Sequence, residues 1–266
     1  MKTNELKTEQ RFPLRTLLWM TLFGIAFANI ESAVVIYLRD IFYPEGFSFP
    51  LKAISPNIES IRNIFTVEVF REVATMLLLV SIAAVASKNF KVGFAWFIYA
   101  FAIWDIFYYF FLFVFLGWPE SLLTWDVLFL LPVTWVGPVI APIINSIYMI
   151  LLALVIIRYW QTEKLIKKWH WAGLFLGALI IIISYTEDYV GFMSTDFSLF
   201  ELTDVNNTGL LMEKIQNYVP QRFAWWLYST GVVIHLIIIG NIFITARKKY
   251  VSAMAQYKMD NRYIIK

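Results

Sequence analysis

The sequence predicts an all-α, polytopic integral membrane protein with about six transmembrane helices and both termini in the cytoplasm. Several apolar runs reach the roughly 20 residues that a helix needs to cross a bilayer. The chain of 266 residues is 60% hydrophobic and 15% charged, whereas about a quarter of the residues in a soluble domain are charged. Basic and non-basic connections also alternate along the chain, as they do in proteins that cross a membrane several times.

The charge of the connections predicts the orientation. Short cytoplasmic loops accumulate Lys and Arg, and the connections between the basic segments are neutral or acidic, most clearly in residues 187–213. We therefore expect a multi-pass protein of the cell membrane, with the bacterial inner membrane as the favoured location. The basic segments, all predicted to be cytoplasmic, are residues 2–15, 88–91, 158–168 and 247–249.

The apolar runs define the predicted elements in chain order. The six spans are expected at about residues 14–38, 68–87, 92–116, 139–159, 171–185 and 223–246. Short helices are also expected in two outer connections, at about residues 57–65 and 209–218. The resulting organisation is a cytoplasmic N-terminal tail (1–13), one transmembrane domain (14–246) with outer loops at 39–67, 117–138 and 187–222, and a basic cytoplasmic tail (247–266).

The segment 118–138 is apolar but is interrupted by Pro119, Pro132, Gly137 and Pro138. Proline lacks a backbone N–H and breaks a helix. Non-helical backbone at membrane depth is tolerated only where protein covers it or where it faces water. We therefore expect an outer re-entrant or interfacial hairpin here, and not a seventh crossing.

Ionisable and polar side chains inside or beside the spans mark a candidate pocket for a ligand or an ion. An ionisable group at membrane depth costs several kcal/mol, so each one is a functional candidate. If the helices form one bundle, most of these groups converge in its outer half, with the sixth span as one wall and the hairpin as a lid. The candidate residues are Glu31, Glu68, Arg71, Glu72, Asp105, Tyr108, Tyr109, Asp126 and His235.

Arg71 and Glu68 each have a structural interpretation beside the functional one. Arg71 could pair with Glu31 or Asp105 and hold helices together. Glu68 could serve as a negative charge near the start of a helix, where it complements the helix dipole. Both interpretations stay open at this stage.

His235 raises the question of a haem or a metal. The other histidine, His170, lies at the opposite predicted depth, so ligation of one haem by both is not expected. A haem held by one histidine stays open, as does a metal site of His235 with Glu31, Glu72 and Asp105, whose ligand types suit zinc, iron or manganese. A buried, hydrogen-bonded His235 is the favoured interpretation.

The predicted function is binding, with or without transport, of a proton, a cation or a small amphiphile in an outward-facing pocket of carboxylates and arginine. The alternatives are a membrane enzyme for a lipid-linked or quinone-like substrate, and a structural subunit that anchors other membrane subunits. The chain has no cysteine, which excludes disulfides and thiolate-ligated clusters. The expected partner is the lipid bilayer rather than nucleic acid, because the net charge of +3 comes from the cytoplasmic flanks. Catalytic residues and cofactors are left open.

Overall fold

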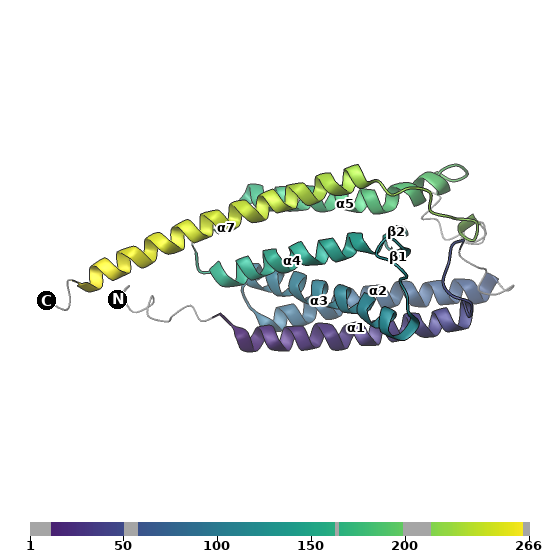
Figure 1. The fold of residues 1–266 in the computed structure, drawn as a ribbon, viewed down its shortest axis with the longest axis horizontal. Helices are drawn as coiled ribbons and strands as arrows, with labels where there is room; N and C mark the ends of the chain where they lie inside the picture. The colour runs from purple at the N-terminus through teal and green to yellow at the C-terminus, as the bar shows by residue number, and fades with distance from the viewer. Residues whose placement is uncertain (1–11, 51–57, 163–164, 199–213, 263–266) are drawn as a thin grey trace.

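Six long helices make up most of residues 12–50, 58–162, 165–198 and 214–262, which are the residues that the computed structural model describes (Figure 1). Each of the six is long and apolar enough to cross a membrane. This agrees with the predicted multi-pass membrane protein. The helices are α1 (Leu14–Phe42), α2 (Ile58–Ala86), α3 (Phe90–Leu116), α4 (Ile140–Tyr159), α5 (Lys168–Met193) and α7 (Trp225–Arg262).

The helices form two groups joined through α4. Helix α3 packs against α1, α2 and α4, while α5 and α7 pack against each other and α4 also contacts α7. In Figure 1 the beginning of α1 and the end of α7 lie at the same end of the bundle. This is the arrangement expected for an even number of crossings. The side of the membrane on which that end lies stays a prediction.

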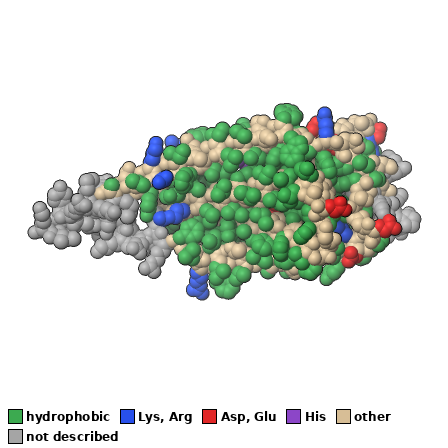
Figure 2. Space-filling view, in the orientation of Figure 1, with side chains coloured by type: hydrophobic (Ala, Val, Ile, Leu, Met, Phe, Trp, Pro, Cys, Tyr) green, Lys and Arg blue, Asp and Glu red, His purple; other side chains and the backbone are tan. Residues whose placement is uncertain are grey.

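Charge is distributed unevenly between the two ends. On the face shown in Figure 2, hydrophobic side chains cover the middle of the molecule. Lys and Arg gather mainly toward the end where α1 begins, and the Asp and Glu side chains lie toward the opposite end. A hydrophobic band between charged ends is the surface that a bilayer-spanning protein requires.

Local sequence signals explain the tight connection from α2 to α3. The side chain of Asn89 caps α3 by accepting hydrogen bonds from the backbone N–H groups of Lys91 and Val92. Asparagine is a preferred residue at this position. At the other end of α3, Gly117 adopts a left-handed conformation with φ of 64° and donates its N–H to the carbonyl of Phe113. Glycine reaches this conformation without the strain of a side chain.

The helices approach closely where glycine faces a neighbour. A Cβ atom on Gly177 would lie 2.6 Å from the ring of His235 and 3.2 Å from the carbonyl oxygen of Gly231. A Cβ atom on Gly24 would likewise lie 2.8 Å from the side chain of Ile103. Small residues at such crossings let transmembrane helices pack through van der Waals contact.

The segment 118–138 forms a two-stranded antiparallel hairpin of β1 (Trp125–Phe129) and β2 (Trp135–Pro138). The predicted break is confirmed, because α4 begins only at Ile140. The all-α description is incomplete, since the aromatic and β-branched residues of this segment pair as strands. The depth of the hairpin in a bilayer, and hence its re-entrant or interfacial character, stays a prediction.

Most helices are longer than the spans predicted from hydropathy, and α1 for example continues past 38 to Phe42. Helix α2 runs without interruption from Ile58, so the short helix expected at 57–65 is the first part of α2, ahead of the candidate membrane span that begins at Thr66. Helix α5 extends to Met193, and α7 continues to Arg262 through the basic segment. Residues 209–213, half of the helix expected at 209–218, lie outside the described residues.

Candidate functional site

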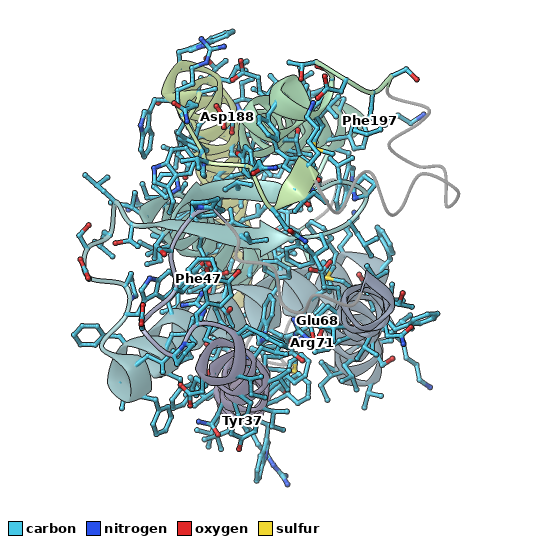
Figure 3. The ribbon with its side chains drawn as sticks, turned by 90° about the vertical axis from the view of Figure 1, so that its right-hand side faces the viewer. Tyr37, Phe47, Glu68, Arg71, Asp188 and Phe197 are labelled. Carbon is cyan, nitrogen blue, oxygen red and sulfur yellow. The ribbon has the colours of Figure 1, made fainter. Side chains whose placement is uncertain are left out.

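A cavity of about 650 Å³ opens inside the helix bundle at the end that carries the hairpin. Its walls come from α1, α2, α3, α4, α5 and the hairpin, with additional contacts from Phe47, Ile215 and Gln216 in the connections. The expectation that the sixth span forms a wall is wrong, because α7 packs against α4 and α5 and contributes no residue to the lining. Figure 3, viewed along the bundle, shows Glu68 and Arg71 side by side on α2.

Eight of the nine candidate residues line this cavity, and His235 does not. The ring of His235 lies against Tyr148, with 4.9 Å between the ring centroids, and its Nε2 is 2.8 Å from the carbonyl oxygen of Leu174. The structure therefore agrees with a buried, hydrogen-bonded His235. That the other eight residues bind a ligand remains a proposal.

Arg71 on α2 binds two carboxylates, Glu68 on its own helix and Glu31 on α1. Its Nε and Nη2 donate to Glu68 Oε2 at 2.9 and 2.7 Å, and its Nη1 donates to Glu31 Oε2. Glu31 is 5% exposed and Arg71 retains 23% of its side-chain exposure. Of the two partners considered for Arg71, the structure gives Glu31 and not Asp105.

Glu72 joins α2 to the hairpin. Its two carboxylate oxygens lie 2.8 and 3.0 Å from the backbone nitrogen of Leu130, which donates to them. Leu130 directly follows β1. The side chain is buried, so this hydrogen bond holds the hairpin against α2 from inside the protein.

Asp126 and Arg39 join the hairpin to α1. Arg39 Nη2 donates to Asp126 Oδ1 at 3.0 Å, and both side chains are buried. The Arg39 guanidinium also lies over the rings of Trp118 and Phe47, at 3.7 and 4.4 Å from their centroids. Burial raises the pKa of Asp126 to about 6, although Arg39 acts in the opposite direction. The cation–π contacts stabilise Arg39 independently of that carboxylate.

Asp105 lies on α3 between the polar and the apolar parts of the cavity. It accepts a hydrogen bond of 2.8 Å from the hydroxyl of Ser146 on α4. Within the described residues neither Asp105 nor Glu72 takes part in an ion pair. Both carboxyl groups line the cavity, so they are available to a ligand without first displacing a positively charged side chain.

On the side of Asp105 that faces away from the hairpin, toward the start of α3, the cavity is lined mainly by apolar side chains. From Phe97 to Tyr109 the lining of α3 extends about 18 Å along the helix, at about 1.5 Å per residue. Sequence reasoning missed the contributions of α4 and α5 to this wall, because nothing in a single sequence states which helices are neighbours. The apolar lining includes Met76, Phe97, Phe101, Met149, Ala178 and Ile182.

The metal and haem hypotheses gain no support from the arrangement. In the part of the chain that the structure describes, no three His, Asp or Glu side chains are placed to hold one metal ion. The proposed set of Glu31, Glu72, Asp105 and His235 is not assembled, since His235 lies outside the cavity lining. His170 is engaged elsewhere, with its Nε2 3.1 Å from Asn241 Oδ1.

The fold and its apolar surface define a multi-pass membrane protein. No protein-family model matches the chain, and no curated protein or solved structure is significantly similar to it. The cavity and the residues that line it are therefore the features that indicate a function.

Proposed function

We propose that this membrane protein binds a small amphiphile in its cavity, with the polar head at the hairpin end and the apolar part toward the middle of the bundle. The observation that carries the proposal is the polarity of one continuous cavity. Its outer part contains Arg71 and several carboxyl groups, and its inner part is apolar and aromatic. An amphiphile has the same two-part character.

The size of the cavity supports a small molecule. Sites for small ligands have volumes of about 300–1,000 Å³ and are lined mainly by apolar side chains with a few convergent polar groups. The cavity of about 650 Å³ has these properties. Of the three ligand classes that the sequence leaves open, an amphiphile makes use of the whole cavity, whereas a proton or a bare cation makes use of its polar end alone.

The loop charges predict that the polar end of the cavity faces the outside of the cell. Under this proposal the head of the ligand lies near the outer membrane surface, where water is available, and its apolar part lies at the depth of the lipid chains. The hairpin covers the head from the outside, held in place by its contacts with Glu72 and Arg39.

The test is to fill the apolar end and follow the bound ligand. Ala178→Phe on α5 puts a phenyl ring into the lining of the cavity. Ala172→Phe makes the same change on the same helix at an exposed position outside the lining. Each variant and the wild type would be purified in mild detergent, and the bound lipids would be extracted and quantified by mass spectrometry against the bulk membrane lipids.

We expect an amphiphile to be enriched in the wild type and in Ala172→Phe, and to be depleted in Ala178→Phe. Equal lipid content in all three proteins would contradict the proposal. Conversion of the amphiphile by the purified protein would indicate a membrane enzyme. Co-purification of other chains, together with no enriched lipid, would favour an anchoring subunit.

A further inference from the structure

The polar end of the cavity carries more negative than positive groups. Among the described residues, the lining includes five carboxyl groups and two guanidinium groups, and it includes no Lys or His. Both arginines are already engaged, Arg71 with Glu31 and Glu68, and Arg39 with Asp126.

Two carboxyl groups are left without a cationic partner in the described structure, and both face the same cavity. Glu72 accepts hydrogen bonds from the backbone next to β1, including that from the N–H of Leu130, and Asp105 accepts one from the hydroxyl of Ser146. A carboxylate has about four lone-pair sites, so each group can accept further hydrogen bonds from a ligand. Desolvated carboxylates without a counter-charge are costly in a protein interior.

We propose that the ligand carries a cationic head with N–H donors, that is, a protonated amine, and that this head binds between Glu72 and Asp105. This rests on the proposed function and specifies the chemical class of the ligand. An anionic head is disfavoured because it would meet the excess of negative groups, and both guanidinium groups already have carboxylate partners. The cavity itself is the site, and the two carboxyl groups select the head.

Aromatic rings around the polar end suit the same head. Trp104, Tyr108 and Tyr109 belong to the lining on α3, close in sequence to Asp105. The faces of such rings attract ammonium groups, and the attraction is greater where water is excluded. Both the carboxyl groups and the aromatic rings would thus stabilise a bound protonated amine.

The experiment compares three single-chain probes that share a twelve-carbon tail: dodecylamine, dodecanol and dodecanoate. Binding would be measured by native mass spectrometry of the full-length protein released from nanodiscs of phosphatidylcholine, whose head has no N–H donor. The test variant is Glu72→Gln with Asp105→Asn, because both amides keep the oxygens that accept the hydrogen bonds from Leu130 and Ser146. The matched control is Glu120→Gln, which neutralises an exposed carboxyl group outside the lining.

We expect the wild type and Glu120→Gln to bind dodecylamine at least about tenfold more tightly than dodecanol, with dodecanoate weakest. A tenfold difference corresponds to about 1.4 kcal/mol. The double variant should lose this preference for the amine while it still binds dodecanol. Thermal melting of each variant shows that it is folded, and if the double variant does not fold, Asp105→Asn alone provides the same comparison.

Equal binding of dodecanol and dodecylamine by the wild type would overturn the cationic head but would leave the amphiphile site standing. An unchanged amine preference in the double variant would overturn the assignment to Glu72 and Asp105. Failure of all three probes to bind would count against the proposed function itself.

An amine head could belong to a free amine or to a membrane lipid such as phosphatidylethanolamine. Displacement of dodecylamine when that lipid is added to the nanodiscs would support the proposal, with the membrane as the source. Undiminished amine binding in its presence would support the proposal with a free amine as the source.

Discussion

Replacing Arg71 by methionine should reveal which carboxylate depends on it. The guanidinium bridges Glu31 on α1 and Glu68 on α2. Removing one partner from a buried ion pair costs about 3–5 kcal/mol, because an unpaired charge is left behind. Arg71 keeps 23% of its side-chain exposure, so solvent offsets part of this cost. We expect Arg71→Met to lower the free energy of unfolding by about 2–4 kcal/mol.

A second substitution tests the pairing itself. Arg71→Met combined with Glu31→Leu removes both charges of the contact and should recover a large part of the lost stability, with a coupling energy of about 1–3 kcal/mol. The matched control is Arg71→Met with Asp105→Leu. It removes a carboxyl group that does not pair with Arg71 and should recover nothing. The free energies of unfolding would be compared by titration with sodium dodecyl sulfate in mixed micelles.

Binding measured on the same proteins separates a structural role from a functional one. If Arg71 and Glu31 only join α1 to α2, the stabilised double variant should bind the amphiphile as the wild type does. If they contact the head of the ligand, the double variant should fold and bind weakly. Recovery of stability with Asp105→Leu equal to that with Glu31→Leu would refute the pairing on which this reasoning depends.

Three further outcomes are expected. In intact cells an impermeant thiol reagent should label Glu120→Cys and not Lys91→Cys. Labelling of Lys91→Cys alone would show that the orientation is opposite to the predicted one. Because Asp126 has a pKa raised from 3.8 to about 6, its protonated form is favoured by folding. This stabilisation is present below about pH 4 and is lost as the pH rises through about 6. The melting temperature of the wild type should therefore fall as the pH rises from about 4 to about 6. In Asp126→Asn the contribution of Asp126 to this fall should be absent. Gly177→Ala should lower the free energy of unfolding by about 1–3 kcal/mol through overpacking. Gly191→Ala should be neutral or slightly stabilising, because an added Cβ atom at Gly191 would meet nothing within 4 Å.

The number of helices and the break before α4 were predictable because each is encoded locally. Length and hydropathy define the spans, and Pro132 and Pro138 interrupt the helix whatever surrounds them. The ends of the helices were less predictable. Hydropathy detects the apolar part of a helix, so the polar turns of α2 before Glu68 and of α7 after Ala246 were not included in the predicted spans.

The candidate site was predictable in its residue types and less so in its arrangement. A charged residue within an apolar run is easily recognised in a sequence, so Glu31, Arg71 and Asp105 could be found without a structure. The pairing of Arg71 with Glu31 depends on the rotation of two helices about their axes. The position of His235 behind Tyr148 depends on which helices are neighbours. Neither quantity is encoded in any short segment of the chain.

The second helix is attached to the bundle partly through polar contacts, and this affects how the cavity could open. Among the described residues, close helix packing of α2 involves mainly α3, and its links to α1 and to the hairpin are the polar contacts of Arg71 and Glu72. Because the N–H of Leu130 is shared between both oxygens of Glu72, a ligand head that takes one of these oxygens would weaken the link to the hairpin without disturbing the apolar core. The carboxyl group of Glu72 would then both bind the ligand and hold the hairpin over the cavity. Occupancy of the site could therefore control access to it.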